Sequence, residues 1–265
     1  MKQMPSSLLT DPYREIALPR APLVLVLTQA RIPHTPELAD RSTLERIHRR
    51  LRVDFPVPRW PSVASTKDDS VAQASDAMQL RMETIDKEWF ATVGPESIAL
   101  STTAYSSRVD FVDRARKVLD AVAVEAAVPA CDRLGVRYVD RVTDAAVLAD
   151  LAKYVLPALL GIVELPVRDG VEAVHSLSDS LLKTGAQTRL RIRSGVLPPE
   201  AVMDVSIAPV QQPSWVLDID SYREETIPFT AELADHISNL AEDAYQLFRW
   251  GVTESFITHF GGELQ

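Results

Sequence analysis

The sequence predicts an α+β fold in which two antiparallel sheet units each pack against a long helix. Short apolar and alternating runs typical of strands recur along the chain, and two stretches, 108–128 and 230–248, carry apolar residues at helical spacing. Several strands followed by one long helix occur twice, which favours an internal duplication. No residues recur at a fixed period, so the duplication rests on this order alone.

The first half of the chain begins with an extended arm over residues 1–20, where prolines are frequent and periodicity is weak. We expect one α+β domain over 21–265, with 21–165 and 166–265 as the halves of the duplication. The elements expected in the first half are a strand at 23–27, a helix at 36–51, a three-stranded meander within 76–105 and a helix that Ser107 caps.

The sequence of the rest of the chain predicts the same order of strands followed by a long helix, with less regular spacing. An apolar stretch after the next strand indicates a helix that Pro157 breaks, and Gly251 is a natural end for the last long helix. The expected elements are a strand at 134–142, the broken helix at 145–161, a hairpin of 171–182 and 187–193, a strand at 214–222 and a helix at 230–248.

Size and composition indicate an intracellular globular protein. With 265 residues, 46% of them apolar, the chain can bury a core without disulfides, and it contains a single cysteine, Cys131. Apolar runs are far shorter than the roughly 20 residues of a membrane-spanning helix. The first residues lack the pattern of a secretory signal, so we expect a cytoplasmic protein.

Charge is distributed unevenly along the chain. Residues 1–60 contain 10 Lys and Arg against 6 Asp and Glu, whereas residues 201–265 contain 2 against 11. The net charge of −9 argues against general nucleic-acid binding. A basic beginning and an acidic end favour association with a protein partner, and a solvated acidic helix is the plainer interpretation of the end.

Familiar catalytic motifs are absent from the sequence. The five histidines are scattered, and neither a phosphate-binding glycine loop nor a Gly-x-Ser-x-Gly elbow occurs. Cys131 could be a nucleophile, although a small buried hydrophobic residue is the favoured interpretation. We therefore expect no catalytic residue and no cofactor, and whether the chain is an enzyme stays open.

Two charged patterns stand out because alternation places each on one strand face. Asp218 and Asp220 could hold Mg²⁺, although a solvated strand face has the same pattern. Arg189, Arg191 and Arg193 could bind an anion such as phosphate. We favour a third interpretation, in which the arginines and aspartates neutralise each other across neighbouring strands.

The C-terminal end concentrates large apolar side chains next to acidic residues. Such a mixture is typical of an interface with a protein partner. The alternative is a short helix, 253–260, that folds back into the core. The candidate partner-binding residues are Phe248, Trp250, Phe256, Ile257 and Phe260.

Four strand blocks carry a resemblance to a known family: Ala21–Val26, Val93–Leu100, Leu134–Val142 and Leu217–Asp220. They resemble a sporadically distributed, uncharacterised bacterial family about 260 residues long, close to the 265 of this chain. The likeness extends from Pro22 to a C-terminal helical segment like Ala244–Phe260. Leu25 and Asp140 depart from it, because the family usually has an acidic residue and Asn there.

The resemblance implies little about chemistry, since the family has no agreed activity. Its patchy distribution is typical of mobile-element, phage-defence and toxin-and-immunity genes. The sequence therefore predicts a non-enzymatic binding protein, such as an accessory, immunity or regulatory component. The alternative is an enzyme or sensor that binds a phosphorylated ligand or nucleotide with Mg²⁺ through the charged patterns.

Overall fold

The structure is a computed structural model that describes residues 11–264 apart from 61–78, 165–169, 172 and 205. The chain divides into two compact units. Unit 1 comprises Met1–Val24, Arg137–Ser221 and Ala241–Gln265, and unit 2 comprises Leu25–Val136 and Tyr222–Leu240. These units do not coincide with the expected halves 21–165 and 166–265, because each unit collects segments from both.

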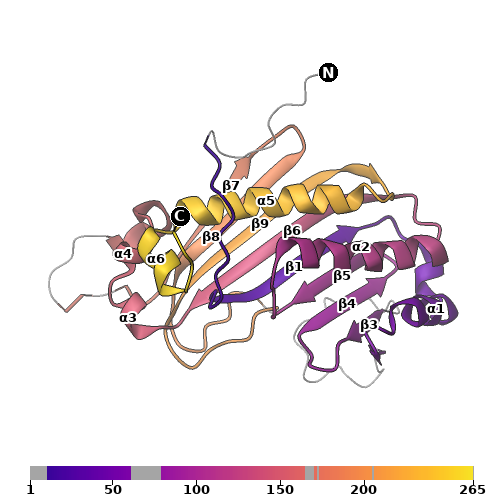
Figure 1. Ribbon diagram of the computed structural model, residues 1–265, viewed down its shortest axis with the longest axis horizontal. Coiled ribbons are helices and arrows are strands. Elements are labelled where there is room, and N and C mark those ends of the chain that lie inside the picture. Colours follow the sequence, from indigo (N-terminus) through magenta and orange to yellow (C-terminus); the bar gives the residue numbers. More distant parts are fainter. Residues whose placement is uncertain (1–10, 61–78, 165–169, 172, 205, 265) are drawn as a thin grey trace. The chain divides into compact units, whose positions relative to one another are not determined.

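The fold is mixed α+β, as the sequence predicts. Its strands form a nine-stranded sheet in the order β2-β3-β4-β5-β1-β6-β9-β8-β7 (Figure 1). The expected internal duplication stays a prediction. The strands are β1 (Leu23–Arg31), β2 (Val57–Arg59), β3 (Leu80–Glu83), β4 (Trp89–Gly94), β5 (Ser97–Thr102), β6 (Ala130–Val142), β7 (Ser176–Lys183), β8 (Thr188–Leu197) and β9 (Ser214–Pro228).

Unit 2 contains the predicted meander, in which β3, β4 and β5 pair antiparallel in chain order. The start of the range expected for it, at 76–78, lies outside the described residues. Its helices are η1 (Pro36–Ala39), α1 (Arg41–Leu51) and α2 (Arg108–Glu125). The Ser107 hydroxyl accepts a hydrogen bond from the Asp110 amide at 3.2 Å, so the predicted cap of α2 is confirmed.

The helix expected over 36–51 is divided, because Asp40 caps a new helix within it. The Asp40 side chain accepts a hydrogen bond from the Thr43 amide at 3.2 Å, and α1 begins directly after it. The side chains of Leu44, Ile47 and Leu51 are buried on one face of α1. The other face, which carries most of the arginines, is therefore left to solvent.

Unit 1 contains the antiparallel hairpin of β7 and β8. In place of the helix expected over 145–161 with a break at Pro157, the chain forms four short helical segments: α3 (Ala145–Leu148), α4 (Leu151–Tyr154), η2 (Pro157–Leu159) and η3 (Gly161–Glu164). Pro157 lacks an amide hydrogen, and Val155 forms an isolated bridge with Val252, so the chain leaves the helical path there.

The long C-terminal helix is α5 (Leu233–Gly251), and the short α6 (Glu254–His259) follows it. The predicted end at Gly251 is confirmed. Residues 13–20 form no helix or strand, and they lie against the unit 1 part of these two helices. The buried Gln246 side chain accepts from the Tyr13 amide at 2.7 Å and donates to its carbonyl at 2.9 Å, so it binds the arm as a neighbouring strand would.

In the described residues, no helix combines the length and apolar character that crossing a membrane requires.

Candidate functional site

The polar face of the sheet in unit 1 carries the arginines and aspartates that the sequence singled out. Arg189, Arg191 and Arg193 alternate along β8, and Asp218 and Asp220 alternate along β9, the neighbouring strand. The other face of these strands is apolar: Leu190, Ile192, Leu217 and Ile219 lie in the core of unit 1. Alternation therefore directs the charged side chains away from that core.

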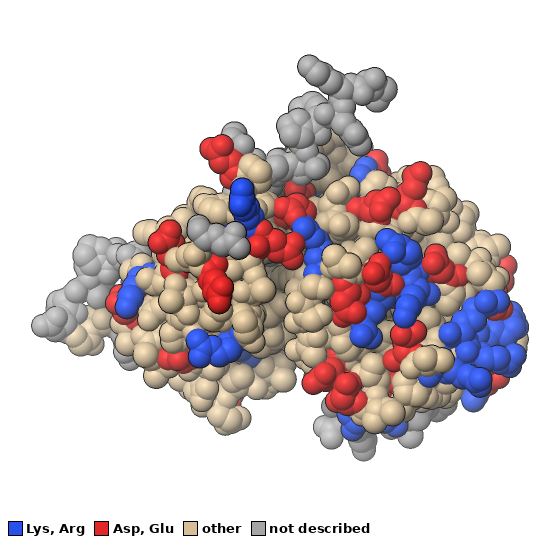
Figure 2. Space-filling model, in the orientation of Figure 1, with Lys and Arg blue, Asp and Glu red and all other residues tan. Residues whose placement is uncertain are grey.

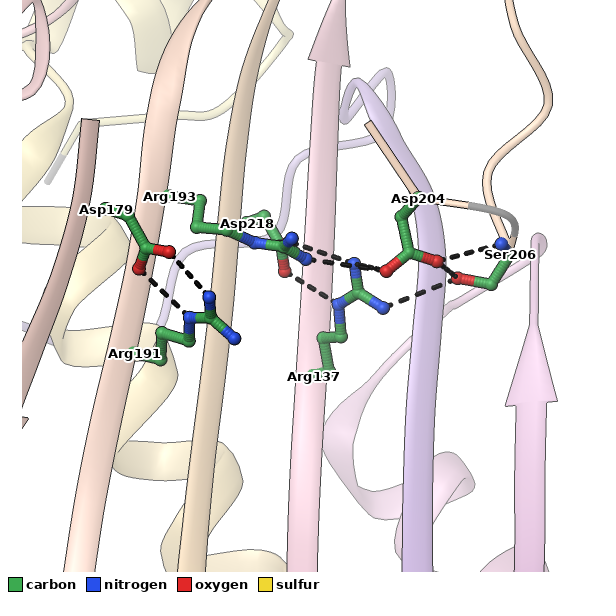
Figure 3. Close-up of polar contacts among 7 residues, drawn as sticks. All are labelled: Arg137, Asp179, Arg191, Arg193, Asp204, Ser206 and Asp218. Carbon is green, nitrogen blue, oxygen red and sulfur yellow. Dashed lines mark hydrogen bonds and ion pairs between the residues drawn. The ribbon is translucent and has the colours of Figure 1, made fainter. Parts of the chain in front are cut away.

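Asp218 lies between two guanidiniums (Figure 3). Arg137 of β6 donates from Nε to Asp218 Oδ1 at 2.8 Å and from Nη2 to Oδ2 at 2.9 Å. Arg193 donates from Nε to Asp218 Oδ2 at 2.9 Å, and its Nη2 contacts the same oxygen. Both carboxylate oxygens of this buried residue are therefore hydrogen-bonded to arginine.

Asp204 supplies the second carboxylate of the cluster. Its Oδ2 lies 3.1 Å from Arg137 Nη2 and 3.5 Å from Arg193 Nη2. Its Oδ1 accepts from the Ser206 amide at 2.8 Å and from the Ser206 hydroxyl at 2.5 Å. Burial opposes ionisation of Asp204, but the hydrogen bonds from Ser206 and the charge of Arg137 outweigh it and lower its pKa to about 2.

These four residues, which we call the arginine–aspartate cluster, are balanced in charge: Arg137, Arg193, Asp204 and Asp218. Burial alone would lower the pKa of Arg137, but the hydrogen bond and charge of Asp218 raise it above its usual value. Removing such charges from water is costly unless each meets an opposite charge. Within the cluster, each buried charge meets an opposite charge from another member. Its chemistry is therefore that of a structural ion network.

The remaining arginines of β8 also have partners. Arg191 donates to Asp179 of β7 from Nε at 2.9 Å and from Nη2 at 2.6 Å, and both side chains are about half exposed. That hydrogen bond is the main reason that the pKa of Arg191 is raised. Arg189 donates to the Thr188 carbonyl at 3.0 Å. The anion-binding face considered from the sequence therefore has its guanidiniums engaged with the protein itself.

A metal site at Asp218 and Asp220 would have to compete with the arginines. Both oxygens of Asp218 are occupied by guanidiniums, and Asp220 lies half-buried on the same face of β9. Within the described residues, no group of three or more His, Cys, Asp or Glu side chains is placed to hold a metal ion.

Sequence reasoning missed Arg137, Asp179 and Asp204. Arg137 lies in the strand expected at 134–142, but nothing local indicates that β6 is the neighbour of β9. Asp179 lies in the expected hairpin, and the paired register of β7 and β8 would have placed it opposite Arg193. Asp204 lies outside the helices and strands and has no periodic signal.

Cys131 is fully buried in β6, as the favoured interpretation expected. Burial raises the pKa of its thiol to about 11. Because the thiolate is the reactive form, this position does not suit a nucleophile at neutral pH.

The C-terminal residues require a correction to the expected partner surface. Phe256 and Ile257 on α6 are 0% exposed and belong to the core of unit 1. Phe248, Trp250 and Phe260 are partly buried and pack against that core. The alternative interpretation, a short helix folded back into the core, describes this segment, because its aromatic area is used in packing.

A second charged feature lies in unit 2, on the solvent face of α1. We call it the basic surface, and Figure 2 shows Lys and Arg gathered over α1. Arg46 and Arg50 share one carboxylate, Glu125, at 2.8 and 2.5 Å. Arg49 and Arg52 have no ionic partner among the described residues. The basic surface consists of the four exposed arginines Arg46, Arg49, Arg50 and Arg52.

Comparison with known proteins adds no assignment, since neither a family model nor a curated protein matches the chain. The resemblance of the strand blocks to a bacterial family therefore stays a prediction.

Proposed function

We propose that the chain is a non-catalytic binding protein whose basic surface meets an acidic surface of a protein partner. The observation that supports this proposal is the charge imbalance on α1. Of the four exposed arginines, Arg46 and Arg50 share the carboxylate of Glu125, whereas the other two have no ionic partner among the described residues. By contrast, the arginine–aspartate cluster is neutral within itself. Charge that is left unmatched at a surface steers association with an oppositely charged partner.

An exposed apolar residue beside the arginines favours a protein over a polyanion such as nucleic acid. Val53 follows Arg52 and is 88% exposed. Protein interfaces combine apolar contacts with a charged rim, whereas nucleic-acid backbones are met mainly by positive charge. The net charge of −9 also opposes general nucleic-acid binding.

The test is partner recovery with a charge-reversed variant. The tagged full chain and its Arg49→Glu/Arg52→Glu variant are isolated from the native host, and bound proteins are quantified by mass spectrometry. The affinity for the recovered partner is then measured with purified proteins at low and high salt. We expect the variant to bind at least about tenfold more weakly, and the wild-type affinity to fall with salt.

The matched control is Arg31→Glu, which reverses an exposed arginine of unit 2 outside α1. It should retain the partner. Equal binding by all three proteins, insensitivity to salt, or displacement of the partner by unrelated DNA or RNA would contradict the proposal.

The alternative is a binding site for a phosphorylated ligand with Mg²⁺ at Arg189, Arg191, Arg193, Asp218 and Asp220. It has less support, because a ligand there would displace ion pairs already made, Arg193 with Asp218 and Arg191 with Asp179. Thermal unfolding with nucleotides and Mg²⁺ distinguishes the two, since a ligand of the folded state raises the melting temperature. A rise that Arg191→Ala abolishes would favour this alternative.

A further inference from the structure

β7 is the last strand of the sheet among the described residues, and most of its side chains are exposed. Three of its leucines are unusually accessible: Leu177 is 38% exposed, Leu181 59% and Leu182 43%. An edge strand with exposed apolar side chains offers backbone donors and acceptors to another strand. β7 is therefore a place where a strand from outside the chain can add to the sheet.

The hairpin determines which backbone groups face outward. The Thr184 amide donates to the Thr188 carbonyl at 3.1 Å, and the register of β7 with β8 continues from that pair. In an antiparallel pair, bonded and non-bonded positions alternate. Leu182, Ser180 and Ser178 therefore bond to β8, whereas the odd-numbered residues of β7 direct their backbone amides and carbonyls outward.

This alternation limits how two copies of β7 can pair antiparallel around a two-fold axis. Because the odd-numbered residues face outward, each must lie opposite an odd-numbered residue of the second copy. One residue of β7 then lies on the axis, opposite the same residue of the second copy. An axis at Asp179 would oppose two carboxylates, and an axis at Ser180 would oppose Asp179 with Leu181. An axis at Leu181 places the two Leu181 side chains together and Asp179 opposite Lys183 of the second copy.

The charge on this face also favours the axis at Leu181. Lys183 is exposed and lies directly opposite Arg189 of β8, so two like charges are neighbours within one chain. A carboxylate opposite Lys183 on its free side reduces that repulsion, and Asp179 of a second copy supplies one. The symmetry forms this contact twice.

We propose that β7 pairs antiparallel with β7 of a second copy of this chain, around a two-fold axis at Leu181. The sheet then continues from one copy into the other through the outward backbone groups of Leu177, Asp179, Leu181 and Lys183. This contact uses unit 1 residues and leaves the basic surface of α1 out, so it does not depend on the proposed function.

Molar mass is measured by light scattering and sedimentation equilibrium on the full chain across a wide range of concentrations. The wild type should show a concentration-dependent dimer. Lys183→Glu and Asp179→Lys should each weaken the dimer at least about tenfold, because each opposes like charges twice. Mixed together with different tags, these two variants should form a heterodimer, because every opposed pair is then complementary.

Two further variants keep folding separate from pairing. Leu181→Pro removes an amide that faces outward, so the hairpin should persist in circular dichroism while the dimer is lost. Arg31→Glu, a charge reversal on an exposed residue of unit 2 outside both surfaces, should leave the dimer unchanged. A wild type that stays monomeric at all concentrations, or a dimer that survives both charge variants, overturns the proposal.

Discussion

The arginine–aspartate cluster of unit 1 contains buried charges that are matched, whereas the basic surface of unit 2 contains exposed charges that are partly unmatched. In the cluster, Asp218 is 2% exposed and each guanidinium meets a carboxylate. On the basic surface, Arg49 and Arg52 are exposed, and no described carboxylate pairs with them. Buried charge must be matched because desolvation is costly, whereas water can solvate an exposed excess. Stability should therefore depend on the first region and binding on the second.

The largest effect is expected at the centre of the cluster. Asp218→Asn leaves Arg137 and Arg193, whose side chains are 13% and 17% exposed, with Asp204 as their remaining carboxylate. Breaking a buried ion pair from one side costs about 3–5 kcal/mol. We expect a loss of that size in the free energy of unfolding, measured by urea denaturation at pH 7.

Asp179→Asn is the matched control, because Asp179 also pairs with an arginine of β8 but is 44% exposed. Its pair with Arg191 is solvated, so the expected loss is below about 1 kcal/mol. Equal losses for the two variants would mean that burial does not determine how much each ion pair contributes to the free energy of unfolding, and would contradict this prediction.

A second prediction concerns Asp140, a buried carboxyl of β6 in unit 1. It is 4% exposed, and burial raises its pKa to about 7. The unfolded chain has a pKa near 3.9, so the unfolded state loses this proton first and stability falls as pH rises from about 4 to 7. Asp140→Asn removes that dependence.

The Asn variant should be more stable than the wild type at pH 8, by up to about 4 kcal/mol, since one pKa unit corresponds to about 1.4 kcal/mol. The gain should shrink towards zero near pH 4, where the wild-type carboxyl is protonated in both states. Urea denaturation at both pH values checks this, and a gain that does not change with pH would contradict it.

Asp204 of the cluster should change stability with pH in the opposite direction to Asp140. Its pKa of about 2 lies below that of the unfolded chain, so its contribution is present above about pH 4 and lost as pH falls towards 2. The carboxylate is 23% exposed, which reduces the expected contribution to about 1 kcal/mol. Asp204→Asn should lose this amount at pH 6 and nothing near pH 2, measured by urea denaturation against wild type at each pH.

The sequence predicted the faces of β8 and β9 because alternation is local, and the pair of Arg193 with Asp218 confirms the expected neutralisation across neighbouring strands. It could not predict that Arg137 and Asp204 complete the cluster. Arg137 and Asp218 are 81 residues apart, and they meet only because β6 lies next to β9 in the sheet. That order is a property of the whole fold. Asp204 comes from a segment without periodicity, where no pattern assigns a direction to a side chain.

The C-terminal segment shows the same limit. A glycine that ends a helix is a local signal, and α5 ends at Gly251 as predicted. Whether Phe256 and Ile257 face a partner or a core depends on where the chain turns after that glycine. Composition is the same in both cases, so tertiary packing decides, and it places both side chains in the core of unit 1.

The smallest effect is expected on the basic surface, at Arg49. Arg49→Ala removes an exposed guanidinium with no ionic partner among the described residues. Alanine is also a slightly better helix former than arginine, and relief of repulsion from Arg46, three residues earlier on α1, acts in the same direction. The free energy of unfolding should therefore change by less than about 0.5 kcal/mol, as for most surface substitutions. Urea denaturation beside Asp218→Asn gives the contrast directly. A loss above about 1 kcal/mol would show that Arg49 contributes to folding, and its exposed charge would then no longer be free to serve a partner.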